Sequence, residues 1–275
     1  MSRCSYQSPD HSSSKSPHFN MAAVDVIVNK FAALWRIRYI RLSLPLIFLG
    51  ISIVGSVVKH TQIVPETYFS NRRNVVNMYF VKVSWGWTLL LLTPFILFTS
   101  YKRLTFALRR LSSLVVATAI WYTFTEAFSY IEGTTGTCHV PEPEAMDQVP
   151  HHDEITSKWS CRKAGGQWDG YAISGHSFIL SYSALIIAEE MAPMVNMEKK
   201  NRNTVLDLLY VSLNWIVVIW IWMFVCTSVY FHDFSEKFLG TVFGILPWFV
   251  TYRIWYPMTL SPGLPLQPKK QSELA

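Results

Sequence analysis

Six long apolar segments dominate this chain and limit the folds that it can adopt. Each approaches the roughly 20 residues that a helix needs to cross a bilayer, and a soluble protein would have difficulty burying several of them. Only 15% of the residues are charged, against roughly one quarter in ordinary globular domains. We therefore predict an all-α integral membrane protein, folded as a six-transmembrane helix bundle. The segments are residues 42–58, 78–100, 111–131, 171–191, 206–230 and 238–256.

Basic residues predict how this bundle lies in the membrane, because cytosolic loops carry an excess of lysine and arginine. With six spans, four basic clusters fall on the same side as the two termini, so we expect both termini to be cytosolic. The opposite, lumenal side holds Lys59, the pair Arg72 and Arg73, and a long, more acidic loop of about 132–170. The four clusters are Arg36, Arg38 and Arg41; Lys102, Arg103, Arg109 and Arg110; Lys199, Lys200 and Arg202; and Lys269 and Lys270.

The two ends of the chain differ in composition from the membrane domain, residues 42–257. Residues 1–41 combine a Ser-rich stretch with a basic flank, and we expect a disordered cytosolic tail. Residues 258–275 are Pro-rich and predict a second unstructured cytosolic tail. The net charge of +6 is explained by membrane topology. Nucleic acid is not an expected partner, since no basic stripe with stacking aromatics lies outside the apolar segments.

Two of the four cysteines, Cys138 and Cys161, share the lumenal loop. In an oxidising compartment they could form a disulfide, and two free thiols are the alternative, because the sequence does not give their distance. Paired histidines in the loop, His151 and His152, lack companion cysteine or histidine spacing for zinc. Solvated loop residues are the better interpretation, and we expect neither a metal nor a cofactor.

The stretch "YAISGHSFILSYSALIIAEEM", residues 171–191, places a histidine at the mouth of an apolar segment. Ionisable groups at membrane depth are costly and often functional. With six spans, His176 and His232 lie at the same lumenal interface, at helix ends that can converge. One imidazole can attack phosphorus while the other donates a proton to the leaving group. We predict such a phosphoryl-transfer pair, with Glu236, or alternatively Asp233, orienting His232.

Other polar residues of the apolar segments have plainer interpretations. Lys82 and Lys237 are candidate phosphate ligands, but lysines that extend to the interface are the more common case. Glu189 and Glu190 end the fourth segment at its cytosolic side, where we expect them to be solvated.

The "SGH" tripeptide with a later histidine resembles the second and third motifs of the lipid phosphate phosphatase superfamily. That resemblance implies that His176 protonates the leaving group and that His232 forms a phosphohistidine. It also implies that Ser174 and the backbone N–H of Gly175 hold phosphate oxygens. The chain departs from the pattern at residue 173, where isoleucine replaces the usual proline, and at residues 225–226, where Val-Cys replaces Ser-Arg.

Those departures point to one branch, and most of the chain, roughly residues 44–265, resembles the fat storage-inducing transmembrane family, its type 2 branch most closely. The resemblance implies an endoplasmic reticulum protein that acts as a fatty acyl-CoA diphosphatase. The expected products are an acyl 4′-phosphopantetheine and adenosine 3′,5′-bisphosphate. It also implies binding of diacylglycerol and triacylglycerol, and a role in lipid droplet biogenesis. The stretches that carry it are "SNRRNVVNMYFVKVSWGWT", "RRLSSLVVATAIWY", "GGQWDGYAISGHSFILSYSALIIAEEM", "CTSVYFHDFSEKFLGTVFG" and "SPGLP".

Two functions therefore remain open at the level of sequence. The first is a phosphoanhydride hydrolase of the lumenal leaflet. The second is a non-catalytic diacylglycerol- and triacylglycerol-binding protein that partitions neutral lipid into droplets. If lipid binding suffices, replacing His176 and His232 should be tolerated; if catalysis matters, it should not.

Overall fold

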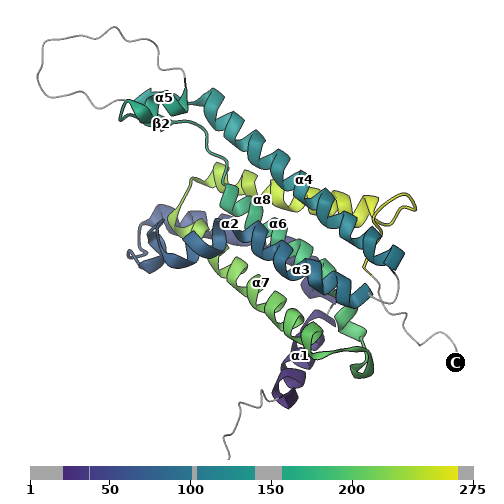
Figure 1. The fold of residues 1–275 in the computed structure, drawn as a ribbon. Helices are drawn as coiled ribbons and strands as arrows, with labels where there is room; N and C mark the ends of the chain where they lie inside the picture. The colour runs from purple at the N-terminus through teal and green to yellow at the C-terminus, as the bar shows by residue number, and fades with distance from the viewer. Residues whose placement is uncertain (1–20, 37, 101–103, 140–156, 266–275) are drawn as a thin grey trace, which may run out of the picture.

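The computed structural model describes residues 21–36, 38–100, 104–139 and 157–265, and these form a helical bundle with a small additional unit at one end (Figure 1). Apart from two three-residue strands, the elements of the described chain are all helical, so the predicted all-α class is confirmed. The elements are α1 (Met21–Arg36), α2 (Arg38–Thr61), η1 (Tyr68–Ser70), η2 (Asn77–Val81), α3 (Ser84–Ser100), α4 (Leu104–Thr135), β1 (Thr137–His139), α5 (Lys158–Lys163), β2 (Gln167–Asp169), α6 (Gly175–Glu190), η3 (Ala192–Asn196), η4 (Lys199–Asn201), α7 (Thr204–Tyr230), α8 (Phe234–Phe249) and η5 (Val250–Trp255).

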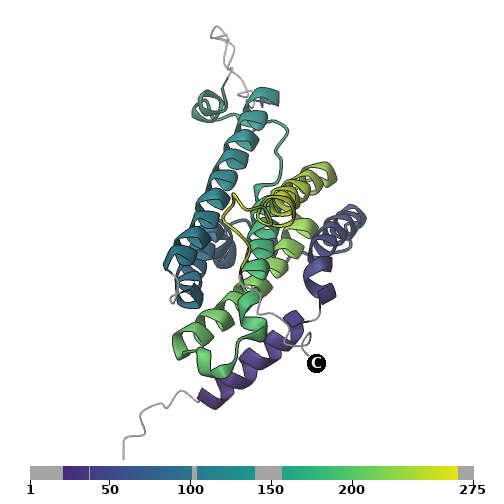
Figure 2. The ribbon, with the colours of Figure 1, turned by 90° about the vertical axis from the view of Figure 1, so that its right-hand side faces the viewer.

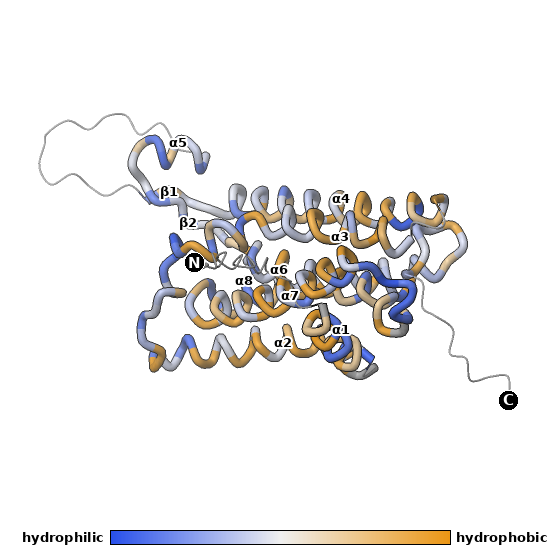
Figure 3. The backbone as a smooth tube through the Cα atoms, turned by 60° about the horizontal axis from the view of Figure 1, so that its bottom comes forward, coloured by the Kyte–Doolittle hydropathy of each residue, from blue (hydrophilic) through white to orange (hydrophobic). Residues whose placement is uncertain are grey.

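Four helical stretches in the described part of the chain are long and apolar enough to cross a membrane. Figure 3 shows the apolar stretches along their lengths. The two remaining predicted spans correspond to α3 and α6, with 17 and 16 residues. At 1.5 Å per residue, these are shorter than a bilayer core of about 30 Å, so the six-span count stays a prediction. The four stretches are Ile40–Thr61, Leu104–Thr135, Thr204–Tyr230 and Phe234–Trp255.

Helix α6 is the centre of the bundle. Every residue from Ser177 to Glu190 is buried, and α2, α3, α4, α7 and α8 all contact it (Figures 1 and 2). A helix that is apolar on all sides is typically buried in this way. Because protein surrounds it, α6 positions the residues at its two ends relative to the rest of the bundle.

Glycines allow α8 to approach α6 closely. A Cβ atom on Gly240 would lie 2.4 Å from the Ser174 carbonyl oxygen, and one on Gly244 would lie 2.1 Å from Ser181 Oγ. Two small residues four apart on one helix face are a common device for close helix packing in membranes. The contact is reinforced where both helices begin, since the Ser174 N–H donates to the Glu236 carbonyl at 3.1 Å.

The N-terminal segment contains a helix that the sequence analysis missed. We expected disorder throughout residues 1–41, but α1 occupies Met21–Arg36 and packs on α7 and η3. It buries Val24, Val28, Ala32 and Trp35, a stripe at helical spacing. The expectation of disorder is therefore wrong for this part, and residues 1–20 lie outside the described chain.

The C-terminal end of α6, which carries Glu189 and Glu190, was also predicted wrongly. Glu189 and Glu190 were expected to be solvated, but their residues are only 6% and 2% exposed. Glu190 accepts hydrogen bonds from Arg110 and Tyr252, and Glu189 accepts one from Arg253. Burial is tolerated because each carboxylate has a cationic partner.

Part of the C-terminal stretch is also ordered, although we predicted an unstructured tail from residue 258. The carbonyl of Gly263 accepts from Arg110, and Ser261 is buried and donates to the carbonyls of Tyr256 and Met258. That expectation is wrong for residues 258–265. Residues 266–275 lie outside the described chain.

The predicted lumenal loop, about 132–170, begins inside α4 and carries a compact unit. Strands β1 and β2 pair antiparallel, with Cys138 opposite Trp168. Cys138 and Cys161 form a disulfide that joins β1 to α5. Trp168 donates its indole N–H to the Glu132 carbonyl at 3.0 Å, which fixes the unit to the end of α4. Residues 140–156, including His151 and His152, lie outside the described chain.

Candidate active site

The N-terminus of α6 presents His176 at the end of the bundle where α7 meets α8. Ser174 is the N-cap: its hydroxyl accepts from the Ser177 N–H at 3.3 Å and from the Ser177 hydroxyl at 3.0 Å. The Ser174 side chain is buried by this role. Gly175 is different, because it is exposed and a Cβ there would meet nothing within 4 Å. The accessible groups at this position are therefore the backbone N–H groups at the N-terminus of α6. A helix N-terminus binds anions favourably.

Asn77 fixes the orientation of the His176 ring. Its Oδ1 lies 3.0 Å from His176 Nε2, while its Nδ2 donates to the Arg72 carbonyl at 2.7 Å. Since the amide nitrogen is already donating, the oxygen faces the ring, and Nε2 is therefore the donor. This leaves Nδ1 as the ring nitrogen that Asn77 does not engage. Asn77 begins the π-helix η2, a distortion often found at functional sites.

His232 lies in the three-residue connection between α7 and α8, in a strained backbone conformation. Its φ is 52°, in the left-handed region that non-glycine residues rarely adopt. Its Nδ1 lies 2.9 Å from Glu236 Oε2. A carboxylate only accepts hydrogen bonds, so Nδ1 carries the proton and Nε2 keeps its lone pair. The same Glu236 oxygen accepts from the Asp233 N–H at 3.2 Å.

Two lysines stabilise this connection and the end of α7 that precedes it. Lys59 Nζ donates to the His232 carbonyl at 2.6 Å and contacts Asp233 Oδ1 at 3.2 Å. Lys237, which is fully buried, donates to the Ser228 carbonyl at 2.7 Å. A cation at the C-terminal carbonyls of α7 is favourable for the helix dipole. Lys237 therefore neither extends to the interface nor faces the site; it anchors the end of α7.

Cationic side chains surround the two histidines. Partial burial and the positive charges of Lys82 and Arg72 act on the His176 ring, and the Arg72 guanidinium lies 5.6 Å from the centre of the Phe231 ring. Lys82 and Arg72 are exposed, unlike Lys237. This end of the bundle thus combines two partly exposed imidazoles with positive charge, an arrangement that can bind a phosphate ester and transfer protons to it.

Sequence reasoning identified both histidines and Glu236, which the structure brings to one end of the bundle. It missed Asn77, for which the sequence offers no signal. It also missed Lys59 and Arg72 as site residues, although a signal existed: both are positive charges on the side where the topology rule predicts few.

Comparison with known proteins was informative at the level of sequence. The profile described as fat storage-inducing transmembrane protein matches residues 65–212 and 196–252. Acyl-coenzyme A diphosphatase FITM2 of Danio rerio is 55% identical over 253 residues, which cover 91% of this chain and 99% of that protein. The Homo sapiens protein of the same name is 45% identical, covering 83% and 88%. Fat storage-inducing transmembrane protein 1 of Homo sapiens is 36% identical, covering 73% and 69%. No solved structure matches the chain.

Proposed function

Because the chain belongs to the fat storage-inducing transmembrane family, we propose that it is a fatty acyl-CoA diphosphatase of the endoplasmic reticulum membrane. Its relatives from Danio rerio and Homo sapiens carry the name acyl-coenzyme A diphosphatase. The observation that carries the proposal is the convergence of His176 and His232 at one end of the bundle, each with one ring nitrogen held by a neighbour.

His232 is the nucleophile in this proposal. Glu236 holds Nδ1–H, so the lone pair of Nε2 attacks one phosphorus of the diphosphate. The bond from that phosphorus to the bridging oxygen breaks, and His176, protonated when the negatively charged diphosphate binds beside it, gives its proton to the departing oxygen. Water then attacks the phosphohistidine while neutral His176 takes a proton from it. The products are an acyl 4′-phosphopantetheine and adenosine 3′,5′-bisphosphate.

Phosphate oxygens are held, in this proposal, by the α6 N-terminus at Gly175 and by the cations Arg72 and Lys82. The Ser174 hydroxyl supports the site chiefly by capping α6, because it is buried and already accepts two hydrogen bonds. The acyl chain stays in the bilayer, where burial is favourable by ~0.8 kcal/mol per CH₂.

The orientation forms part of the proposal: six spans, both termini in the cytosol, and the histidines facing the lumen. The Cys138–Cys161 disulfide supports it, because the unit that it closes leads directly into α6, and disulfides persist in oxidising compartments. Binding of diacylglycerol and triacylglycerol, and support of lipid droplet biogenesis, are proposed as the cellular context.

Turnover of oleoyl-CoA by purified protein tests the function, with released adenosine 3′,5′-bisphosphate as the readout. Replacing His176 by Ala should lower turnover by ~10²–10⁴-fold. Replacing His232 by Ala should remove both turnover and any acid-labile phosphohistidine trapped from ³²P-labelled substrate. His60→Ala is the matched control, since His60 is an exposed histidine at the end of α2.

The results separate the enzyme from its alternatives. Label retained in His232→Ala but lost in His176→Ala would reverse the two roles. Turnover without any label would favour direct hydrolysis with one histidine as general base. Absence of turnover in the wild-type protein, with neutral-lipid binding intact, would favour the non-catalytic lipid-partitioning function.

A further inference from the structure

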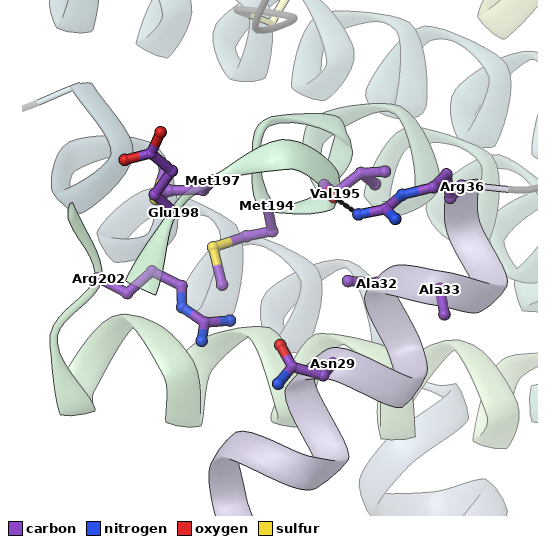
Figure 4. A pocket seen from close by; sticks show the side chains of 9 residues that line it. All are labelled: Asn29, Ala32, Ala33, Arg36, Met194, Val195, Met197, Glu198 and Arg202. Carbon is purple, nitrogen blue, oxygen red and sulfur yellow. Dashed lines mark hydrogen bonds between the residues drawn. The ribbon is translucent and has the colours of Figure 1, made fainter. Parts of the chain in front are cut away.

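A cavity of about 480 Å³ lies far from the histidines, between α1 and the connection from α6 to α7 (Figure 4). One wall is α1, and the other is formed by η3 and by residues on either side of η4, which precede α7. Since α7 has 27 residues, the start of α7 and the His232 end are about 40 Å apart at 1.5 Å per residue. The cavity is therefore separate from the candidate active site.

Arg202 is the central polar residue of this cavity. Its side chain is only 4% exposed, and its Nε has no hydrogen-bond partner among the described residues. Its two carboxylate neighbours are distant: Nη2 lies 3.5 Å from Asp25 Oδ1, and Nε lies 3.6 Å from Asp207 Oδ1. Charge-assisted hydrogen bonds are normally 2.7–2.9 Å. A buried guanidinium with five N–H donors thus retains unused donor capacity.

A second guanidinium approaches from α1. Arg36 donates one Nη2 bond to the Val195 carbonyl at 3.2 Å, and Figure 4 shows its side chain at the opposite rim of the cavity from Arg202, with the Asn29 amide between them. Planar guanidinium groups match the oxygens of phosphate better than a lysine does. The arrangement therefore favours an oxyanion with several acceptor oxygens.

The carboxylates near the cavity are largely occupied by lysines. Lys199 donates to Asp25 and holds the pKa of that carboxyl below its ordinary value, so it remains ionised and paired. Lys200 pairs with Glu198 at 2.7 Å. Asp207 forms its one ion pair among the described residues with Arg202, at the long distance given above. Arg36 has no carboxylate partner within 4 Å in the described chain, and it leaves the cavity with an excess positive charge.

The remaining walls are apolar. Met194 and Met197 line the cavity with Ala32, and Figure 4 shows the Met194 thioether directed into it. Helix α1 also exposes Val26, Ile27 and Leu34 next to charged residues, as do helices that lie in a membrane interface. A ligand with a phosphate group and an apolar portion fits both the two arginines and the apolar walls of the cavity.

We propose that this cavity binds the phosphate group of an amphiphilic ligand, and that the ligand is an anionic phospholipid of the leaflet next to α1. In the proposed orientation this is the cytosolic leaflet. The site is independent of the diphosphatase chemistry, and it would anchor α1 to the membrane surface.

Binding can be measured with the full chain in nanodiscs of phosphatidylcholine, with or without phosphatidic acid. Native mass spectrometry of the released protein reports the phosphatidic acid retained. Inorganic phosphate and adenosine 3′,5′-bisphosphate, added separately as competitors, distinguish a soluble source of the phosphate group. The variants are Arg202→Gln and Arg36→Gln, and the matched control is Lys30→Gln, which removes one exposed charge from α1 outside the cavity.

We expect the wild type and Lys30→Gln to retain phosphatidic acid equally, and both arginine variants to retain about tenfold less. Displacement by soluble phosphate, with no lipid retained, would support the phosphate site and reject the lipid as its source. Equal retention by Arg36→Gln and Lys30→Gln would overturn the proposal and indicate a general annulus of acidic lipid. Arg36 is exposed, so this comparison holds even if Arg202→Gln destabilises the fold.

Discussion

Substituting Gly240 by Ala tests whether the α6–α8 contact sets the spacing of the two histidines. The added Cβ would lie 2.4 Å from the Ser174 carbonyl oxygen, whereas carbon–oxygen contacts are normally about 3.3 Å or longer. The two helices must therefore separate by roughly 0.9 Å at this point. The carbonyl cannot move independently, because the Ser174 N–H is bonded to Glu236 and its side chain caps α6.

The separation should affect both stability and turnover. Overpacking of this kind costs about 1–3 kcal/mol. Because Glu236 and His232 move with the start of α8 while His176 stays on α6, turnover should fall on the order of 10²-fold, the effect of a misplacement near 1 Å. The assays are thermal unfolding in detergent and release of adenosine 3′,5′-bisphosphate per folded molecule.

Gly86→Ala is the matched control, since Gly86 is also helical but its Cβ would meet nothing within 4 Å. It should retain turnover and lose no stability, because alanine favours a helix by ~1 kcal/mol over glycine. Wild-type turnover in Gly240→Ala would refute the reasoning, and so would a loss of stability without a loss of turnover, since the histidine spacing would then depend on other contacts.

Three further substitutions probe other parts of the structure. Replacing Cys138 and Cys161 by Ser should destabilise the unit formed by β1, α5 and β2 by about 3 kcal/mol in the chain-entropy model. The loss is measured as protease sensitivity of residues 157–170, and equal sensitivity with and without the bond would contradict this. Replacing Glu190 by Ala should cost about 3–5 kcal/mol in thermal unfolding, because it leaves the buried Arg110 guanidinium without its carboxylate. Replacing Arg253 by Ala should cost less stability, because Arg253 is 33% exposed. A larger loss for this substitution than for Glu190→Ala would count against the burial argument. Gly175→Ala should fold normally, since its Cβ meets nothing, yet lower turnover about tenfold or more if phosphate rests on the α6 N-terminus; unchanged turnover would place the phosphate elsewhere.

The apolar helices and the two histidines were predictable from the sequence for simple physical reasons. A run of about 20 apolar residues has few folded alternatives, and a histidine beside such a run needs an explanation. Helix α1 escaped prediction because its apolar residues recur at helical spacing between Asp25, Asn29 and Lys30, so no continuous run marks it. Only packing on α7 and η3 reveals which face is buried.

The orientation of the site depends on contacts that sequence does not display. Asn77 meets His176 across 99 residues of chain, and Lys59 meets the His232 carbonyl across 173. Glu236 was predictable because it lies four residues after His232, in the first turn of α8. The burial of Glu190, by contrast, depends on Arg110 and Tyr252 from two other helices. Local spacing therefore predicted the His232–Glu236 pair, and failed where the partner comes from a distant segment.

Helix α6 is fixed at both ends by different interactions, and this has a consequence for the site. At its N-terminal end, glycine packing and the Ser174–Glu236 backbone bond hold it against α8. At its other end, Glu189 and Glu190 pair with arginines from the α8–η5 segment and from α4. A helix held only near His176 could tilt about that contact, and the catalytic geometry would vary with the tilt. The buried ion pairs remove this freedom, so residues at the far end of the bundle help to keep His176 and His232 in register.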